Sequence, residues 1–394
     1  MSLPLDGTLV LDLSRLLPGP LCSMWLADFG AEVIKIEQPG QGDYTRWMPP
    51  LCGDTSGLFL LLNRNKKSVT LDLKQPRGRE VFLRLVREAD VLLEGFRPGV
   101  MDRLGLGYRQ LSEVNPRLIY CAITGYGQDG PYAREAGHDI NYIGLAGILG
   151  QTGTPGADGA PVLPAVQIAD IGGGALPALA GILLGLLARQ RSGRGQMVDV
   201  AMLDGVVSWL PVLLWPLVAG QKEAPGRGSG QLNGGLACYN VYRCRDGSFL
   251  AVGALEPQFW REVCRCLQRE DLIPLQFVWE KQEWLKKTLQ EIFAEQDRSH
   301  WLSLFHGRDA CVTPVHDLTE VPADPQVQHR GMLWQLVHPR LGSLLQLGLP
   351  LQMPALPRAA VQPPPDLGQH TDEVLSRFGY TLSEIEQFRS ERII

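Results

Sequence analysis

The first two hundred residues alternate short, β-rich apolar segments with amphipathic segments of helical periodicity, and this alternation constrains the fold most strongly. A strand that is apolar along its whole length is buried on both faces, and helices between such strands cover those faces. The pattern therefore predicts an open α/β fold with a parallel sheet. The predicted strands cover residues 10–13, 33–36, 68–73, 91–96, 118–123 and 197–202, with predicted helices over 22–29 and 77–88.

The loop after the first predicted strand reads Leu17-Pro18-Gly19-Pro20. A dinucleotide-binding protein would carry the GxGxxG fingerprint at this place, and a nucleoside-triphosphate-binding protein would carry a P-loop. The chain has neither motif where it would be needed. The sequence therefore argues against both of these chemistries.

The character of the chain changes after about residue 204. A Gly-rich segment, GRGSGQLNGG at 226–235, indicates a crossing between two domains, as a chain of 394 residues favours. A hairpin pattern follows at 239–242 and 249–253, and helical patterns continue to about residue 320. Beyond a Pro-rich segment, a final helix near 382–392 is too short to form a domain and must pack on a folded one.

Charge and cysteine usage restrict the partners of this chain. The 37 basic and 42 acidic residues give a net charge of −5, which argues against nucleic-acid binding. The eight cysteines are scattered, without the clustering that disulfide frameworks or zinc sites need. We therefore expect reduced thiols and no metal site.

Two stretches without charged residues, 171–188 and 205–220, could be mistaken for membrane spans. The first is at the short limit for crossing a bilayer, and the second is shorter and contains two prolines. Buried or interface helices are the better interpretation. With no signal-peptide pattern at the N-terminus, we expect a cytoplasmic protein that does not bind membranes.

Three places combine polar residues with unusual surroundings. His138 stands in GHDINY, where a helix start capped by Asp139 or Asn141 is the simpler interpretation. Asp170 stands in IADIGGG before a long apolar helix, where it could be an N-cap carboxylate. Three consecutive glycines exceed what a cap requires, and they suggest close approach of the backbone to a ligand or another chain. Glu256 in ALEPQF could be an ordinary loop acid.

Together these segments resemble the class III CoA-transferase family, and within it the branch of alpha-methylacyl-CoA racemases. The resemblance runs nearly from end to end and is carried by PLDGTLVLDLSRLLPGP, LADFGAEVIKIEQPGQGD, NRNKKSVTLDLKQPRG, GFRPGVMDRLGLGY, NPRLIYCAITGYGQDGP, RSGRGQMVDVAMLDG, YRCRDGSFLAVGALEPQFW, DACVTPV and GQHTDEVL. It implies a Rossmann-like large domain, a smaller α/β domain, and two interlocked subunits that bind acyl-CoA thioesters between them. We accordingly expect a large domain at 1–204 and 326–394, a linker at 205–235 and a small domain at 236–325.

The resemblance also implies roles for the three polar places. Asp170 matches the aspartate shared by the family, which in transferases attacks a CoA thioester to form an aspartyl anhydride and in racemases transfers a proton. His138 and Glu256 match a histidine–glutamate pair of the racemases. A 1,1-proton transfer through an enolate needs one base on each face of the α-carbon, so His138 with Glu256 would serve one face and Asp170 the other. Backbone N–H groups at the Asp170 helix start would hold the enolate oxygen.

The expected contacts to coenzyme A follow from the same resemblance. They are Leu71, Lys74, Phe96, Arg103 and Leu104, together with Gly137, Asp139 and Tyr142 around the histidine. The substrate itself carries coenzyme A, so no separate cofactor is expected. Relatives commonly have an arginine where this chain has Gln38, so we expect a phosphate or adenine contact there to be either weakened or replaced, with Lys35 as the candidate replacement.

Overall fold

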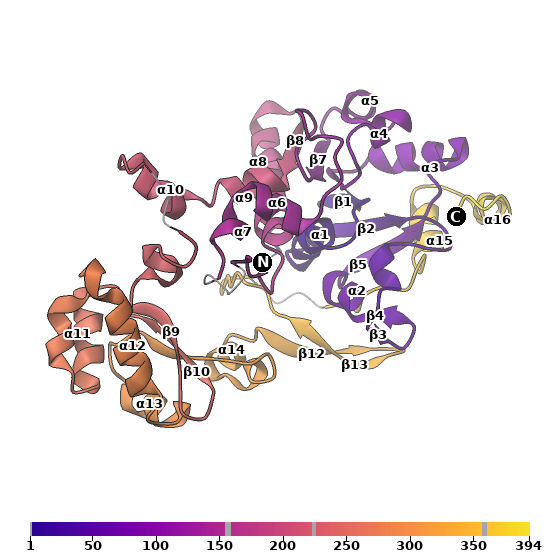
Figure 1. Ribbon diagram of the computed structural model, residues 1–394. Helices are drawn as coiled ribbons and strands as arrows, with labels where there is room; N and C mark the ends of the chain where they lie inside the picture. The colour runs from indigo at the N-terminus through magenta and orange to yellow at the C-terminus, as the bar shows by residue number, and fades with distance from the viewer. Residues whose placement is uncertain (1, 154–158, 223–225, 357–360) are drawn as a thin grey trace. The chain divides into compact units, whose positions relative to one another are not determined.

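The chain forms two compact units in a computed structural model that describes residues 2–153, 159–222, 226–356 and 361–394 (Figure 1). The first unit contains the chain up to Ala146, Val166–Trp209 and His329–Ile394, and the second contains Gly147–Ala165 and Leu210–Gln328. Residues 147–165 were expected in the large domain but belong to the second unit. There Arg227 donates hydrogen bonds to the carbonyl oxygens of Gly150 and Gly159.

The first unit is built on the predicted parallel sheet. Its six strands are β1 (Leu9–Asp12), β2 (Glu32–Glu37), β5 (Lys66–Thr70), β6 (Val91–Glu94), β7 (Ile119–Thr124) and β8 (Gln196–Ala201). They lie in the order β5-β2-β1-β6-β7-β8, and every pair is parallel. This is the doubly wound Rossmann order, which reverses direction between β1 and β6. The carboxyl ends of β1 and β6 are therefore where a ligand is expected.

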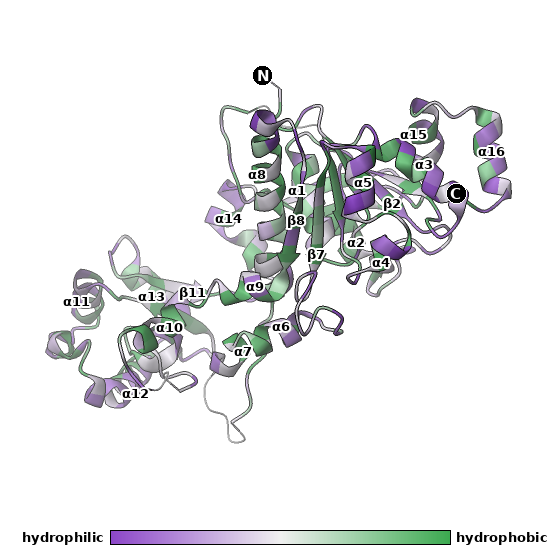
Figure 2. Ribbon diagram, turned by 90° about the horizontal axis from the view of Figure 1, so that it is seen from above, coloured by the Kyte–Doolittle hydropathy of each residue, from purple (hydrophilic) through white to green (hydrophobic). Residues whose placement is uncertain are grey.

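Helices cover both faces of this sheet (Figure 2). One face carries α1 (Pro18–Asp28), α8 (Leu176–Ser192) and α9 (Met202–Val207), and α6 (Asp139–Leu145) packs on α9. The other carries α3 (Pro76–Val86), α5 (Tyr108–Val114), α15 (Thr371–Arg377) and α16 (Leu382–Ser390). The shorter elements of the unit are η1 (Tyr44–Arg46), α2 (Gly57–Leu62), α4 (Val100–Arg103), η2 (Ala169–Ala175), and the strand pairs β3–β4 (Leu51–Cys52, Thr55–Ser56) and β12–β13 (Leu333–His338, Gly342–Leu347).

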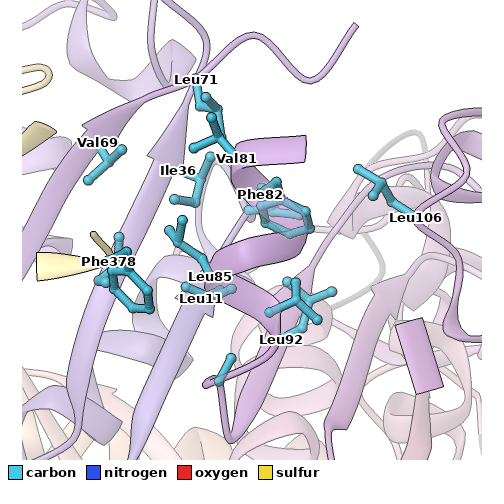
Figure 3. Packing of buried hydrophobic residues seen from close by; sticks show 14 of the residues in the cluster. Leu11, Ile36, Val69, Leu71, Val81, Phe82, Leu85, Leu92, Leu106 and Phe378 are labelled. Atoms are coloured by element: carbon cyan, nitrogen blue, oxygen red, sulfur yellow. The ribbon is translucent and has the colours of Figure 1, made fainter. Parts of the chain in front are cut away.

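The core beneath α3 shows why this segment is a helix. Pro76 fits its first turn, and Val81, Phe82 and Leu85 recur at helical spacing and are fully buried against the sheet. Figure 3 shows these side chains packed on residues from neighbouring strands, with Leu71 next to Val81. Burial of such side chains contributes roughly 1.5–3 kcal/mol each.

The C-terminal segment completes this core. Phe378, Ile385 and Phe388 are buried in the same cluster, and the carbonyl oxygen of Ile393 accepts the N–H of Asp72 at 2.7 Å. A capping box begins α16, because the hydroxyl oxygen of Thr381 accepts the backbone N–H of Glu384. The tail thus packs on the first unit as part of its hydrophobic core.

The continuous apolar helix Ala169–Ser192 is long and apolar enough to cross a membrane, with a mean hydropathy of 2.0. A core helix of a folded domain passes the same test of length and composition. Its sheet side is buried through Ala178, Ile182 and Gly185, and it packs on β7 and β8. This is the helix that the sequence predicted at 171–188.

The second unit has a core of its own. Its helices are α7 (Ile148–Gln151), α10 (Pro211–Val218), η3 (Gln231–Gly235), α11 (Pro257–Cys266), η4 (Glu270–Leu275), η5 (Trp279–Lys281), α12 (Gln282–Phe293), α13 (Arg298–Phe305) and η6 (Val321–Ala323), and α14 (Pro325–His329) ends at its border. The predicted hairpin is β9 (Tyr239–Arg243) with β10 (Phe249–Gly253), and a third strand that was not predicted, β11 (Val312–Val315), pairs with β10.

Candidate active site

Asp170 lies in η2, a stretch of π-helix that leads directly into α8. Such π-helical insertions occur frequently at functional sites. The residue before the stretch, Ile168, is its N-cap. The carboxyl group of Asp170 is half-buried and accepts no hydrogen bond from the residues that the structure describes. The interpretation of Asp170 as an N-cap carboxylate is therefore wrong.

The carboxylate that satisfies this helix start comes from Asp139. Its Oδ1 accepts the backbone N–H of Ala169 at 2.5 Å and that of Asp170 at 3.1 Å. His138 precedes Asp139 and is the N-cap residue of α6. The structure thus brings together the predicted residues His138, Asp139 and Asp170, because α6 packs on η2.

The surroundings of Asp170 change its acidity. Burial raises the pKa of its carboxyl group to about 6, the negative charge of Asp139 adds to this effect, and His138 opposes it. A carboxyl group with a pKa near neutrality can both accept and return a proton at physiological pH. Asp170 therefore has the acidity that a proton-transfer base requires.

The three glycines after Asp170 are explained by packing within this chain. A Cβ on Gly172 would lie 1.8 Å from the Trp209 ring, and a Cβ on Gly173 would lie 2.4 Å from the carbonyl oxygen of Met202. Gly205 in α9 faces Gly173 in turn, with its own Cβ position 2.4 Å from the Gly173 Cα. The close approach predicted from the glycine run is real, and its partners within this chain are α9 for Gly173 and Trp209, which follows α9, for Gly172.

The N–H groups expected to hold an enolate oxygen are already used. Asp139 occupies those of Ala169 and Asp170, and the N–H of Ile171 donates to Gln167 at 3.2 Å. The predicted role of the Asp170 helix start in binding the oxyanion is therefore wrong for these donors.

The loop that leads to His138 is held by Tyr142. The Tyr142 hydroxyl donates to the carbonyl oxygen of Gly137 at 2.6 Å, and the ring is buried. A Cβ on Gly137 or Gly125 would lie within 2.7 Å of this ring. The expected contact of the Tyr142 side chain with coenzyme A therefore competes with its role in fixing the loop.

The two cations expected to bind phosphate groups are accessible. Lys74 follows β5 and Arg103 ends α4, and both side chains are exposed. Neither forms an ion pair or side-chain hydrogen bond with the described residues. Leu104 packs partly on the core, whereas the side chain of Leu71 is only 2% exposed, so its backbone alone can face a ligand.

Lys35 does not replace the arginine that relatives carry at the position of Gln38. Its side chain is fully buried, and its Nζ lies 2.9 Å from Asp43 Oδ2 and 2.8 Å from the carbonyl oxygen of Ser14. Gln38 is exposed at the end of β2. The expectation for Lys35 is wrong because β2 is an interior strand whose residues 33–37 are all buried, so the Lys35 ammonium group is used in the buried pair with Asp43.

The sequence reasoning missed a cationic group at the point where the strand order reverses. Arg15 follows β1, and its guanidinium lies 5.2 Å from the ring centroids of both Tyr44 and Phe96. Its NH1 group also donates to the Tyr44 hydroxyl at 3.1 Å. We call these three residues the Arg15 cluster. The only signal in the sequence was a cation directly after the first predicted strand.

A second missed residue is Glu94 at the end of β6. Its Oε2 accepts the N–H of Phe96 at 2.6 Å, and the Tyr120 hydroxyl donates to Oε1 at 3.4 Å. Burial raises the pKa of Glu94 to about 7. An acid at the end of the apolar run VLLE could have drawn attention to it, because buried carboxylates require partners.

Comparison with known proteins identifies the relationship. The model of CoA-transferase family III matches residues 5–371. The chain belongs to CoA-transferase family III. It is similar to human alpha-methylacyl-CoA racemase, with 41% identity over 400 residues that cover 99% of this chain and 97% of the relative. It is also similar to human succinyl-CoA:glutarate CoA-transferase, with 37% identity over 380 residues that cover 94% and 85% of the two chains.

A solved structure supports the fold of this CoA-transferase family III protein. A CAIB/BAIF family protein from Brucella suis superimposes with a TM-score of 0.82 and 32% identity, covering 96% of this chain and all of the other.

The third residue that the sequence predicted to be catalytic, Glu256, is exposed and is the N-cap of α11. Glu256 belongs to the second unit, whereas His138 and Asp170 belong to the first. The predicted pairing of Glu256 with His138 joins residues of different units and therefore stays a prediction.

Proposed function

We propose that this CoA-transferase family III protein inverts the α-carbon of 2-methylacyl-CoA thioesters by 1,1-proton transfer. The observation that carries the proposal is Asp170: its half-buried carboxyl group, with a pKa of about 6, is free of hydrogen bonds from the described residues, and its backbone is bonded to Asp139, which directly follows His138. The similarity to human alpha-methylacyl-CoA racemase supports the same reaction.

The proton transfers follow from the chemistry of a thioester. One base removes the α-proton, and the electron pair of the broken C–H bond moves into the thioester to form an enolate. The conjugate acid on the opposite face then donates a proton to the α-carbon, which inverts its configuration. His138, oriented by Glu256, serves one face and Asp170 the other. These steps need no group beyond the side chains and the thioester itself.

The rest of the substrate requires cations and an apolar surface. Lys74 and Arg103 are exposed and have no ion-pair partner among the described residues, so both are suited to the phosphate groups of coenzyme A. Within the proposal, two subunits of this cytoplasmic enzyme interlock and together bind the thioester. An apolar surface that such a partner could cover lies on α8, where Leu183, Leu184 and Leu187 are exposed.

The alternative is a CoA-transferase, which one observation favours. The carboxylate of Asp170, free of hydrogen bonds from the described residues, could attack a thioester and displace the CoA thiolate, which forms an acyl-aspartyl anhydride. The thiolate then attacks the aspartyl carbonyl, which releases the donor acid and leaves an aspartyl-CoA thioester. An acceptor acid and the thiolate repeat these two steps in reverse, which yields the acceptor's CoA thioester and regenerates Asp170. The similarity to human succinyl-CoA:glutarate CoA-transferase is consistent with it. The histidine at position 138 has no part in that reaction.

The deciding experiment incubates the protein with one epimer of a 2-methylacyl-CoA in D2O, without any acceptor acid. A racemase incorporates deuterium at the α-carbon and forms the other epimer. His138→Ala should abolish both outcomes in a racemase but leave acid-dependent CoA transfer intact. Absence of deuterium at the α-carbon, together with a covalent species trapped by hydroxylamine when an acid is added, would reject the racemase in favour of the transferase.

A further inference from the structure

The carboxylate of Asp139 connects two elements of the candidate site that are far apart in the sequence. It belongs to the first turn of α6, and its Oδ1 accepts the N–H groups of Ala169 and Asp170, 31 residues further along the chain in the second case. Hydrogen bonds to an ionised acceptor are stronger than neutral ones. Asp139 therefore fixes the backbone of Asp170 relative to α6.

Asp139 is not needed to cap its own helix. The side-chain Oδ1 of Asn141 accepts the backbone N–H of His138 at 3.0 Å, and the Asn141 N–H donates back to the carbonyl oxygen of His138 at 2.8 Å. These two bonds close the start of α6. The Asp139 carboxylate is consequently free to serve the neighbouring helix, on which it places a negative charge beside a second carboxyl group.

The charges that face Asp170 are few. The stretch η2 packs on α1, α6, α8, α9 and β8. Among the described titratable groups on and next to these elements, Asp139 and His138 influence the acidity of Asp170. Tyr142 of α6 also faces Asp170, as an uncharged phenol whose pKa is raised to about 12 by burial, by Tyr126 and by Asp170. Asp204 acts on Asp199 of β8 instead. Two nearby carboxyl groups resist simultaneous ionisation.

We propose that Asp139 is a positioning residue for Asp170, with two separable effects: its oxygen holds the Asp170 backbone in place, and its charge opposes ionisation of the Asp170 carboxyl group. The inference rests on the proposed function, in which Asp170 is one of the two bases. The first effect governs how well the base reaches the α-carbon, since small displacements of a catalytic group are costly. The second sets the pH range in which the base works.

Two variants separate these effects. Asp139→Asn keeps an oxygen acceptor but removes the charge, whereas Asp139→Ala removes both. At pH 8 we expect kcat of Asp139→Asn to exceed that of Asp139→Ala by about tenfold, and we expect Asp139→Asn to move the acidic limb of the pH profile to lower pH. Asp139→Ala should show the same movement and a fall in kcat of about ten- to a hundredfold with little change in KM. Glu113→Gln, an exposed acid of α5, is the matched control.

A titration independent of turnover completes the test. In protein with 13C-labelled aspartate carboxyl groups, Asp170 is assigned by its loss in Asp170→Asn, and its titration should move to lower pH in Asp139→Asn but not in Glu113→Gln. An unchanged Asp170 titration in both Asp139 variants would overturn the inference about charge. Equal loss of kcat in Asp139→Asn and Asp139→Ala would overturn the inference about the retained acceptor. Absence of deuterium exchange in the unmodified protein would instead reject the proposed function and leave the carboxyl titration interpretable.

Discussion

The ammonium group of Lys35 lies 2.9 Å from the carboxylate of Asp43, and both side chains are fully buried. Lys35 also donates to the carbonyl oxygen of Ser14, and Asp43 Oδ1 accepts the N–H of Leu16 at 3.3 Å. The pair therefore joins β2 to the loops after β1 and β2, which carry Arg15 and Tyr44 of the Arg15 cluster. Lys35, which the sequence suggested for ligand binding, instead stabilises the loops next to the site from within the core.

Removal of the lysine charge should strongly destabilise the first unit. Lys35→Met leaves Asp43 as a buried, uncompensated charge, and we expect a loss of about 3–5 kcal/mol in the free energy of unfolding. Urea denaturation followed by circular dichroism measures it. The double variant Lys35→Met/Asp43→Leu, which removes both charges, should recover much of the loss. A single variant as stable as the parent protein would contradict this account of the pair.

The same network predicts how stability depends on pH. Burial disfavours ionisation of Glu37 and Asp43, but Arg46 and Lys35 outweigh it, so both carboxyl groups have a pKa below the ordinary value in the folded state. Their contribution is fully present above the unfolded-state pKa of about 4 and is lost as the pH falls through the lower folded-state pKa. Urea midpoints should therefore decline from pH 5 to pH 3. Glu37→Gln should flatten that decline. An equal slope in the variant and the unmodified protein would contradict the assignment of the decline to Glu37.

The acidity of Asp170 predicts a pH profile for the proposed racemase. Because its pKa is about 6, the ionised base is depleted as the pH falls below that value. For the epimer whose α-proton Asp170 removes, the exchange rate at pH 5 should be about tenfold below its plateau. Deuterium incorporation measured from pH 5 to pH 8 tests this. A rate that stays constant down to pH 5 would exclude Asp170 as the base for that epimer.

The glycine pair between η2 and α9 should tolerate no side chain. Gly173→Ala would place a Cβ 2.4 Å from the carbonyl oxygen of Met202. Because the backbone of η2 or α9 must move to accommodate the new methyl group, we expect a loss of about 1–3 kcal/mol in the free energy of unfolding. The same movement displaces Asp170, so deuterium exchange activity should also be lost. Gly150→Ala is the control, because nothing lies within 4 Å of its Cβ position. Similar stability of the two variants would refute the packing explanation.

Arg103, the exposed cation at the end of α4, should contribute to substrate binding rather than to chemistry. Charge-assisted hydrogen bonds to phosphate are worth about 1.5–3 kcal/mol, so Arg103→Ala should raise KM for a CoA thioester about tenfold or more while kcat is unchanged. Steady-state kinetics at two salt concentrations measure it. Arg109→Ala, which removes an exposed arginine of α5, should leave KM unchanged. A KM for Arg103→Ala equal to that of the control would remove this residue from the proposed binding site.

Much of the architecture could be predicted from the sequence. The apolar runs at 10–13, 33–36 and 118–123 lie within one or two residues of β1, β2 and β7. Such predictions succeed because periodicity and apolar content are local properties of the chain. The motifs also led to His138 and Asp170, which the structure places beside each other through Asp139.

Other features depend on which segments meet in three dimensions, so no local pattern could predict them. The partner of the glycine run is α9, and the cap of η2 is a carboxylate from α6. Lys35 is buried in an ion pair although its residue type suggested a surface contact. The sequence alone thus determined the elements and the reactive residue types. Tertiary structure decided burial, charge neighbours and backbone contacts, and these set the acidity and position of Asp170.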